Sequence, residues 1–328
     1  MATVELFSIG NALVDQEFLV TDEFLAEAEL QKGTMQLCDA TQQAALVSKL
    51  NQSATHKGQA SGGSAANTTV AFSALGGSAF YACRVGNDDL ATFYLNDLTN
   101  NKVETAQTSL SEGQTGTCIV LITPDSERTM YTYLGITAEL ATAQIDFTSL
   151  ETAKWLYIEG YLATSPTAQQ AVAQARQIAK DNGVQIAISL SDPAMVQYAK
   201  SGLDALIADG VDLLFCNEQE ALMYTQQESL EQASQALLKI ATTVVITLGG
   251  KGALICQQNQ DDLLVAGQHV VAVDTNGAGD AFAGAFLYAV TQQQSLIEAA
   301  NLGNKVASAV VSQYGPRLAY DAYQVFVK

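Results

Sequence analysis

Short runs of consecutive apolar residues alternate along the chain with longer stretches of helical periodicity. These runs are Val4–Ile9, Ala79–Val85, Trp155–Glu159, Gln185–Leu190, Leu213–Cys216 and Thr243–Thr247. A run without polar alternation, followed by a helix and then by another such run, indicates buried parallel strands joined by crossover helices. The pattern therefore predicts an α/β fold with a doubly wound, mostly parallel sheet flanked by helices.

One pair of β-rich runs breaks this rhythm. Residues 117–123 and 128–134 are separated by Pro-Asp-Ser-Glu, a turn sequence, and they predict a hairpin. Because a hairpin among βαβ units often leaves the main sheet, this one is a candidate for a small β lid, with an edge hairpin as the alternative. Alternation puts two sets of side chains on opposite faces: Arg128, Met130, Thr132 and Leu134 on one, Thr129, Tyr131 and Tyr133 on the other.

Composition and charge exclude several classes of protein. Hydrophobic residues make up 48% of the 328 residues and charged residues 15%, which allows a large core. With 34 acidic and 15 basic residues, the net charge of −19 disfavours binding to nucleic acid and to anionic membrane surfaces. No apolar run approaches the ~18 residues of a membrane span, and the start lacks the features of a signal peptide. We expect one domain over residues 1–328 of a soluble, cytoplasmic protein.

Cysteine and histidine are too sparse for most metal and nucleophile sites. The five cysteines have no zinc or iron–sulfur spacing and suggest no disulfide framework, so we expect buried free thiols. Only His56 and His269 occur, so a site with several histidine ligands is excluded. A Ser-His-Asp triad would depend on one of these two residues.

The strongest chemical signal lies in residues 271–290. A strand is predicted to end at Asp274, and a long helix of small residues opens at Asp280. The helix N-terminus favours an anion, and Asp280 beside it could take a proton from an attacking hydroxyl. The alternative is a structural turn whose aspartate stabilises the helix. The backbone N–H groups that would converge on the anion belong to Asn276, Gly277, Ala278 and Gly279.

Two familiar nucleotide motifs are absent. Gly277-x-Gly279 is not followed by a glycine at position 282, so the dinucleotide fingerprint fails and a nicotinamide dehydrogenase is disfavoured. The run Gly249-Gly-Lys-Gly252 lacks the spacing and the Lys-Ser/Thr pair of a P-loop.

Two segments near the N-terminus suit a ligand that carries hydroxyl groups. Gly62 and Gly63 followed by Asn67 offer bare backbone and one amide side chain, which supply donors and acceptors, although a structural helix start would look the same. Asn11 and Asp15 follow the first predicted strand, where a carboxylate could accept hydrogen bonds from a diol.

Two further segments follow predicted strands. Asn217 and Glu220 suit hydrated Mg²⁺, which keeps its waters and takes few protein ligands, with a solvated helix start as the alternative. The strand that ends at Thr247 runs into the glycine turn from Gly249 to Gly252, which could enclose a nucleotide.

In combination and order, these motifs resemble the PfkB (ribokinase-like) family of carbohydrate and nucleoside kinases. The Gly-Gly-x-x-x-Asn helix start is similar to the first signature of that family, and Asp-Thr-Asn-Gly-Ala-Gly-Asp at 274–280 is similar to the second. Asn217-x-x-Glu220 and Thr247-Leu-Gly-x-x-Gly252 resemble its magnesium and nucleotide motifs. The resemblance covers roughly residues 4–325 and implies a β lid formed by about 12–38 and 112–136.

The resemblance implies a role for each motif. Asp280 is the expected catalytic base, beside an anion hole formed by Asn276 to Gly279. The residues implied to contact the other groups are Asn217 and Glu220 for Mg²⁺, Thr247, Gly249, Gly252 and Asn304 for ATP, and Asp274, Val311 and Gly315 for a monovalent cation such as K⁺.

Within the family, the similarity is greatest to the adenosine kinases and their bacterial relatives. The Gly-Asn-x-x-x-Asp start, the Arg128 strand and the Gln-Tyr-Gly-Pro-Arg ending at 313–317 resemble that branch. There are two departures: Ala12 replaces the usual proline, and Tyr131 and Tyr133 fall on the wrong face to sandwich a purine. The residues implied to bind the acceptor are Asn11, Asp15, Gly62, Gly63, Asn67 and Arg128, whose guanidinium could reach the phosphate.

The expected function is an ATP-dependent phosphotransfer to the 5′-hydroxyl of a nucleoside, converting adenosine to AMP. A kinase of ribose, fructose or a related sugar is the alternative, and a non-catalytic sugar- or nucleoside-binding protein, which would be expected to lack Asp280, is a third. The implied cofactors are ATP and Mg²⁺, with K⁺ less strongly indicated, and the partner is a small-molecule acceptor. We expect a monomer or a homodimer.

Overall fold

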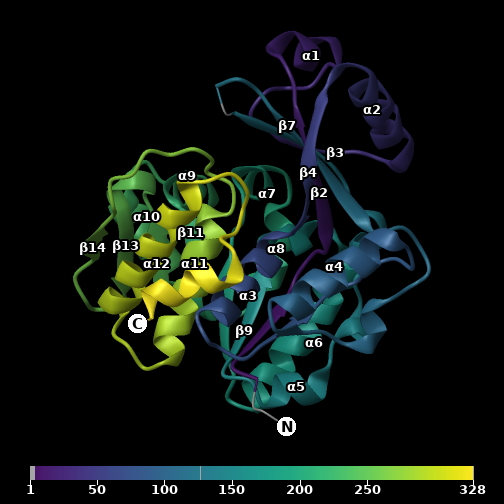
Figure 1. Ribbon diagram of the computed structural model, residues 1–328. Coiled ribbons are helices and arrows are strands. Elements are labelled where there is room, and N and C mark those ends of the chain that lie inside the picture. The colour runs from purple at the N-terminus through teal and green to yellow at the C-terminus, as the bar shows by residue number, and fades with distance from the viewer. Residues whose placement is uncertain (1–3, 126, 328) are drawn as a thin grey trace.

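Two sheets of unequal size organise the protein in the computed structural model, which describes residues 4–125 and 127–327 (Figure 1). In the larger sheet the strands from β12 to β6 pair in parallel, and β13 and β14 are added antiparallel at one edge. The order across this sheet is β14 (Leu263–Ala266), β13 (Gly252–Gln257), β12 (Ala241–Thr247), β11 (Val211–Asn217), β10 (Gln185–Ser189), β9 (Trp155–Glu159), β1 (Leu6–Ile9), β5 (Ala79–Ala82) and β6 (Val103–Glu104).

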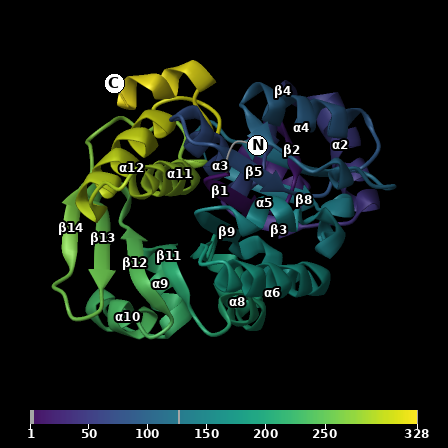
Figure 2. The ribbon, with the colours of Figure 1, turned by 90° about the horizontal axis from the view of Figure 1, so that it is seen from below.

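Helices cover both faces of this sheet, each with its own hydrophobic cluster (Figure 2). One face packs against α3 (Ser64–Ala74), α4 (Asp89–Asn100), α11 (Ala278–Thr291) and α12 (Leu296–Val311). The other packs against α5 (Phe147–Glu151), α6 (Pro166–Asp181), α7 (Pro193–Tyr198), α8 (Lys200–Ile207), α9 (Glu218–Thr225) and α10 (Leu230–Leu237). The predicted doubly wound α/β fold is therefore confirmed.

The coverage of both faces explains the apolar runs in the sequence. Every residue of β9 is buried, because side chains on either side of the strand meet a layer of helices. Helix α6 shows the complementary pattern, with Ala168, Val172 and Ala175 on its buried stripe. Its start follows from local chemistry, since the Ser165 side chain accepts from the Ala168 N–H and Pro166 occupies the first turn.

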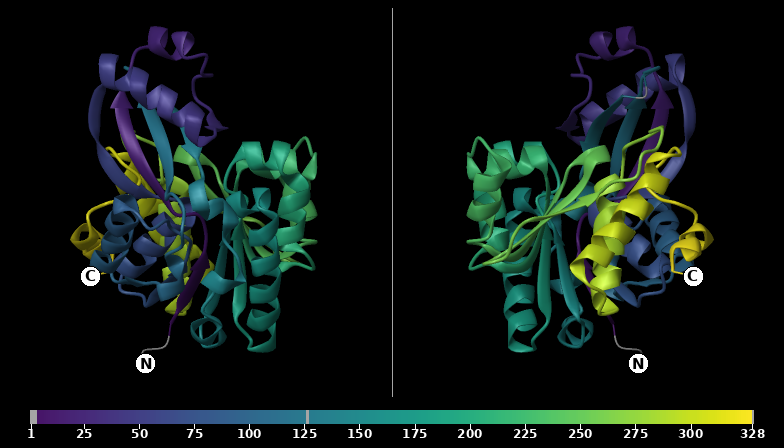
Figure 3. Two further views of the ribbon diagram at one scale, coloured as in Figure 1. Left: turned by 90° about the vertical axis from the view of Figure 1, so that its right-hand side faces the viewer. Right: turned by 90° about the vertical axis from the view of Figure 1, so that its left-hand side faces the viewer.

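The smaller sheet stands away from the carboxyl ends of the main strands (Figures 1 and 3). Its order is β3 (Met35–Leu37), β8 (Arg128–Tyr133), β7 (Gly116–Ile122), β2 (Leu13–Leu19) and β4 (Thr55–Gly62). The predicted hairpin is confirmed as the antiparallel pair β7–β8, and it lies in this second sheet, so the edge-hairpin alternative is wrong. Helices α1 (Asp22–Glu27) and α2 (Ala40–Ser53) accompany it. We call the smaller sheet with α1 and α2 the lid.

The lid is larger than the ranges 12–38 and 112–136 that the sequence suggested. It also contains α2 and β4, and β4 pairs antiparallel with β2 along most of its length. The segment 55–62 reads Thr-His-Lys-Gly-Gln-Ala-Ser-Gly and has no apolar run. It can be a strand because it lies at the edge of the sheet and is largely exposed to solvent.

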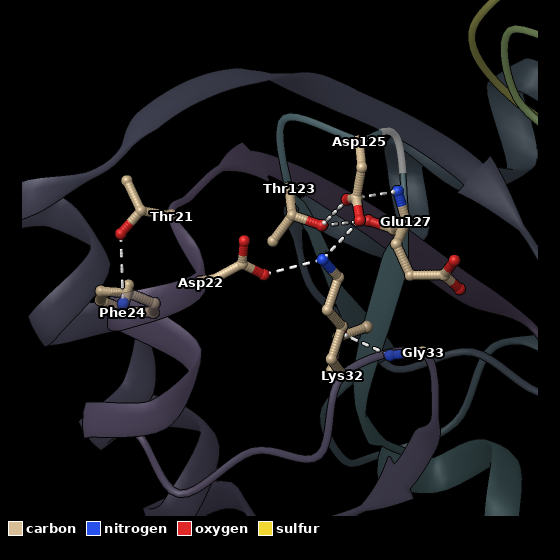
Figure 4. A network of polar contacts seen from close by, with 9 residues as sticks. Thr21, Asp22, Phe24, Lys32, Gly33, Thr123, Asp125 and Glu127 are labelled. Carbon is tan, nitrogen blue, oxygen red and sulfur yellow. Dashed lines mark hydrogen bonds and ion pairs between the residues drawn. The ribbon is translucent and has the colours of Figure 1, made fainter.

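Polar contacts hold together the end of the lid that lies farthest from the main sheet. Figure 4 shows the Lys32 ammonium between two carboxylates, 2.7 Å from Asp22 Oδ1 and 2.6 Å from Asp125 Oδ2. The Thr123 hydroxyl donates to the other oxygen of Asp125 at 2.7 Å, and the Thr21 side chain accepts from the Phe24 N–H at the start of α1. The turn after β7 is thus tied to the segment around α1.

The predicted strand that ends at Asp274 is wrong. Residues 267–277 form a loop between β14 and α11, and Val271 in it is 83% exposed. The backbone N–H groups of Val273 and Asp274 donate to the Val311 carbonyl, at the end of α12, and not to a neighbouring strand. The apolar residues here were misleading because the main sheet already ends at β14.

Two general expectations can also be compared with the structure. All five cysteines are free, and four of them are buried: Cys83, Cys118, Cys216 and Cys256, with Cys38 half-buried. Across residues 4–125 and 127–327, no helix combines the length and the apolar character that crossing a membrane requires.

Candidate active site

A cavity of about 380 Å³ lies where the carboxyl ends of the main strands face the inner side of the lid. Its volume is within the usual range for a small-molecule site. The residues that line it and that follow or end a main strand are Asn11 after β1, Glu159 on β9, Ser189 on β10, Asn217 on β11 and Thr247 on β12. This is the edge at which open α/β sheets bind their ligands.

The wall that the lid contributes is mostly apolar, with the Asp15 carboxylate and the Thr132 hydroxyl as polar groups. Pairing across the lid sheet aligns Asp15 with Cys118, Thr132 and Leu37 in one row. All four residues line the cavity, together with Met35, Met130 and Leu134. The predicted alternation on β8 is confirmed, because Tyr131 packs into the cluster under α2 on the opposite face.

Asp15 is buried in this wall, and Gly62 makes room for it, whereas Gly63 makes room for the backbone of Asn11. Burial raises the pKa of Asp15 to about 7, although the charges of Arg317 and Arg128 act in the opposite direction. A Cβ atom at Gly62 would lie 2.5 Å from Asp15 Oδ1, and one at Gly63, where φ is +96°, would collide with the Asn11 carbonyl. Gly63 lines the cavity, whereas Gly62 lies behind it and permits the close approach of Asp15.

Asp280 lies in the first turn of α11 and is held by two donors from α3. The Ser64 hydroxyl donates to Oδ1 at 2.6 Å, and the Asn67 amide donates through Nδ2 to Oδ2 at 2.8 Å. The pKa of Asp280 is raised by desolvation, which these two hydrogen bonds and the charge of Arg317 oppose. The small residues of α11 allow this approach, since a Cβ atom at Gly284 would collide with the Thr68 carbonyl of α3.

The turn before α11 offers fewer free N–H groups than the sequence suggested. The N–H of Asn276 donates to Asp274 Oδ1 at 3.0 Å, and that of Ala278 donates to the Thr275 carbonyl at 3.3 Å. Gly277 adopts a left-handed conformation, with φ of +73°. Gly277 and Gly279 both line the cavity, and their N–H groups are the ones that we assign to an anion at this helix N-terminus.

Asn217 and Glu220 form the start of α9 as a reciprocal capping box. The Glu220 N–H donates to Asn217 Oδ1 at 2.8 Å, and the Asn217 backbone N–H donates to Glu220 Oε2 at 3.0 Å. The side-chain amide of Asn217 also donates to Glu220 Oε1 at 2.6 Å. Glu220 is 3% exposed and lines the cavity. Burial raises its pKa to about 7, and the nearby Asp192 and Asp280 add to the effect.

These residues fit a hydrated Mg²⁺ better than a fully protein-bound metal. Among the described residues, no group of three or more His, Cys, Asp or Glu side chains is arranged to hold a metal ion. Mg²⁺ usually takes one or two carboxylates and completes its shell with water and substrate phosphates. A buried carboxylate that lines the cavity close to two other acids, as Glu220 does, matches that requirement.

The segment predicted to bind ATP follows β12. Thr247 lines the cavity, Gly249 opens a short 3₁₀ turn, and Gly252 begins β13. Asn304 is buried, and its amide donates to the carbonyls of Val265 at 3.2 Å and Ala266 at 3.1 Å. It therefore ties α12 to the edge strand β14 and lies outside the residues that line the cavity.

Asp274, Val311 and Gly315 lie close together, but donors already occupy the Asp274 carboxylate and the Val311 carbonyl. Asp274 Oδ2 accepts from the Gly315 N–H at 2.8 Å and pairs with Arg128, which lies 3.3 Å from Glu17 as well. The Val311 carbonyl accepts from the N–H groups of Val273 and Asp274. In this arrangement Arg128 links the lid to the loop before α11, and the K⁺ site stays a prediction.

Glu159, Ser64 and Arg317 were not singled out from the sequence. Glu159 is fully buried and accepts from the N–H groups of Asn11 at 2.7 Å and Ala65 at 2.8 Å. Its place as the last residue of a predicted parallel strand was a usable signal. Ser64, which directly follows Gly63, had no separate signal. Arg317 is one of four arginines in a strongly acidic chain, and its rarity could have drawn attention to it.

Buried carboxylates give a prediction about stability. Burial raises the pKa values of Asp15, Glu159 and Glu220 to about 7, whereas in an unfolded chain such groups ionise near ~4. Between these values the folded state binds more protons than the unfolded state, so stability falls as the pH rises. We expect the Tm of the ligand-free protein to be about 5 °C or more lower at pH 8 than at pH 5.5 by calorimetry.

The variant Glu220→Gln separates this effect from general charge repulsion in a chain of net charge −19. It should show a smaller fall of Tm over the same range, because one of the three titrating groups is gone. A Tm that rises from pH 5.5 to pH 8 would contradict the assignment.

Comparisons with known proteins agree with this geometry. Residues 34–322 match the family described as pfkB family carbohydrate kinase. The adenosine kinase of Saccharomyces cerevisiae is 28% identical over 334 residues, which cover 96% of each protein. The ribokinase of Haemophilus influenzae is 28% identical over 257 residues, which cover 77% of this chain and 82% of that protein.

Two solved structures show the same arrangement. One is a probable sugar kinase from Rhizobium etli CFN 42, and the other is an adenosine kinase from Sinorhizobium meliloti. Each is 33% identical to this chain, has a TM-score of 0.90 and is matched over 98% of both chains.

Proposed function

We propose that this chain, which belongs to the pfkB family of carbohydrate kinases, phosphorylates the 5′-hydroxyl of a nucleoside and converts adenosine to AMP. As a member of that family it is a phosphotransferase that uses ATP. The observation that supports a nucleoside most directly is the lid wall, where the Asp15 carboxylate lies in one row with Cys118, Thr132 and Leu37. A ribose diol needs the carboxylate, and a base beside it needs the apolar surface.

Asp280 is the proposed base. It lines the cavity in the first turn of α11, with one oxygen held by Ser64 and the other by Asn67, so its remaining lone pairs are directed by these contacts. An acceptor hydroxyl within hydrogen-bond distance of this carboxylate would lose its proton as the bond to phosphorus forms. The raised pKa of Asp280 makes the carboxylate a better proton acceptor than an exposed aspartate.

The amides of Gly277 and Gly279 are proposed to stabilise the transferring phosphoryl group. They lie at the N-terminus of α11, where the helix dipole adds to the effect of the N–H groups. Mg²⁺, when bound, supplies positive charge that neutralises the phosphate oxygens. Glu220 and Asn217 would hold it through water, and the lid would exclude bulk water from the site.

Sugar kinases among the relatives keep a second acceptor class open. The polar side of the cavity, formed by Asn11, Asp15 and Asn67, suits a ribose ring whether or not a base is attached. The apolar lid residues favour the larger nucleoside. A non-catalytic binding protein has no support, because Asp280 is present and its two oxygens have donors from α3.

We place the reaction in the cytoplasm. Free cysteines, four of them buried, are typical of a reducing compartment.

Steady-state kinetics with a panel of acceptors tests the proposal. At saturating Mg-ATP, we expect kcat/KM for adenosine to exceed that for ribose or fructose by at least ~10-fold, because one well-buried apolar face contributes more than ~1.4 kcal/mol. Release of ADP measures turnover for every acceptor in the same way. Equal or better efficiency with ribose or fructose would reject adenosine as the acceptor and leave the phosphotransferase assignment intact.

A further inference from the structure

The segment after α12 brings an arginine to the interface between α3 and α4. Arg317 donates from Nε to Asn67 Oδ1 at 2.6 Å, and its Nη1 lies 2.8 Å from Asp97 Oδ2 on α4. The side chain is only 11% exposed. Arg317 is therefore held in place by Asp97 and makes direct contact with the residue that donates to Asp280.

Asn67 stands between an obligate donor and an obligate acceptor. A guanidinium can only donate hydrogen bonds, and an ionised carboxylate can only accept them. The two ends of the Asn67 amide therefore fit in one orientation, with Oδ1 toward Arg317 and Nδ2 toward Asp280 at 2.8 Å. Without Arg317, nothing at the far end of the amide would oppose a rotation that turns Oδ1 toward the carboxylate.

We propose that Arg317 is a positioning residue for phosphoryl transfer, which orients the Asn67 amide so that Asp280 is held ready to accept the hydroxyl proton. This inference rests on the proposal that Asp280 is the base. Packing alone does not account for the arginine. Its Nη2 atom is buried without a hydrogen-bond acceptor among the described residues, which costs free energy that an apolar side chain would avoid.

The positive charge of Arg317 favours the ionised form of Asp280, as does the hydrogen bond from Asn67. It lowers the pKa of that carboxyl, whereas desolvation raises it. Among the described residues, Arg317 is the one cation whose charge acts on Asp280. The other ionisable groups that face Asp280 are Asp15 on β2, Tyr157 and Glu159 on β9, Tyr161 after β9, Glu220 on α9 and Tyr323 in the C-terminal 3₁₀ helix Tyr320–Phe326.

The test compares Arg317→Met with the native enzyme and with Arg84→Met. Arg84 is also partly buried, but it contacts Ser111 and Glu139, and none of these three residues lines the cavity. In Arg317→Met we expect kcat to fall about 10- to 100-fold with KM for ATP and acceptor nearly unchanged. In the pH profile of kcat/KM, the acid limb should move to higher pH. The ionised form of Asp280 loses both a fixed donor and a nearby cation in this variant, so the pKa of Asp280 rises. Arg84→Met should keep the native kcat and profile.

A chemical rescue separates positioning from folding. In Arg317→Ala, added methylguanidinium should restore part of kcat and return the acid limb toward the native pH, which a merely structural role would not produce. A native kcat and pH profile in Arg317→Met would overturn the inference, as would a loss that neither shifts the profile nor responds to methylguanidinium. Asp280→Asn is measured alongside: activity in that variant would reject Asp280 as the base, whereas an inactive Asp280→Asn with a native-like Arg317→Met would reject only the role of Arg317.

Discussion

Replacing Asp280 with asparagine is expected to lower kcat by about 10²–10⁴-fold, while the KM values for ATP and acceptor change little. The amide has nearly the same size as the carboxylate, so α11 and the turn before it should keep their structure. It cannot accept the proton of the acceptor hydroxyl. One end of the amide would also present N–H groups to Ser64 or Asn67, which both donate to the native carboxylate.

Single-turnover measurements make this prediction sharp, because they report the chemical step separately from binding and product release. Asp209→Asn is a matched control: it removes an exposed carboxylate that pairs with Arg176 and Lys180 and does not line the cavity. That variant should retain native kcat. Activity in Asp280→Asn within a few-fold of the native enzyme would reject Asp280 as the base.

Replacing Asp15 with alanine should weaken acceptor binding and leave ATP binding intact. A hydrogen bond to a charged group contributes roughly 1.5–3 kcal/mol, so the loss of two such bonds to a diol corresponds to a rise in acceptor KM of about 10²–10⁴-fold. Asp15 lies on the lid sheet beside Cys118, whereas the proposed ATP turn follows β12 of the main sheet. Asp22→Asn, which removes one partner of Lys32 in the same lid, is the control and should bind acceptor normally.

The pKa of Asp15 adds a second measurement to this prediction. Burial raises that pKa to about 7, so in the free enzyme Asp15 is mostly ionised only above this pH. The ionised carboxylate is the form proposed to bind the acceptor. The native KM for the acceptor should therefore rise as the pH falls from 8 to 6, and this dependence should be absent in Asp15→Ala. An unchanged acceptor KM together with a higher ATP KM would contradict the assignment.

The main sheet could be predicted from the sequence because its strands are buried on both faces. Runs such as Trp155–Glu159 contain no polar alternation, and strands with that pattern were placed correctly in the interior of the sheet. Segments at the edges of the two sheets were harder to predict. The polar strand β4 was missed because an edge strand needs no apolar run, and the apolar residues around Val271 suggested a strand that the structure shows as a loop.

The candidate site could be predicted only as far as its residues follow strands or open helices. Asn11, Asn217 and Asp280 belong to this class, and all three line the cavity. The contacts that tune them involve residues far apart in sequence. Asn67 and Arg317 are separated by 250 residues, and no local pattern indicates that the packing of α3 against α11 and α4 brings them together. Such pairs follow from tertiary structure alone.

In the proposed assignment, the lid contributes to acceptor recognition, whereas the groups proposed for phosphoryl transfer lie outside the lid. The lid supplies the wall with Met130 and Leu37, whereas α9 and α11, at the carboxyl edge of the main sheet, supply Glu220 and Asp280. Substitutions on the inner lid face can therefore change which molecule is accepted without touching the residues that transfer the phosphoryl group. An ancestral enzyme of this form could diversify its acceptor range by drift on one small sheet, under little constraint from the catalytic step. Laboratory evolution aimed at a new acceptor should begin with the inward positions of β3 and β8.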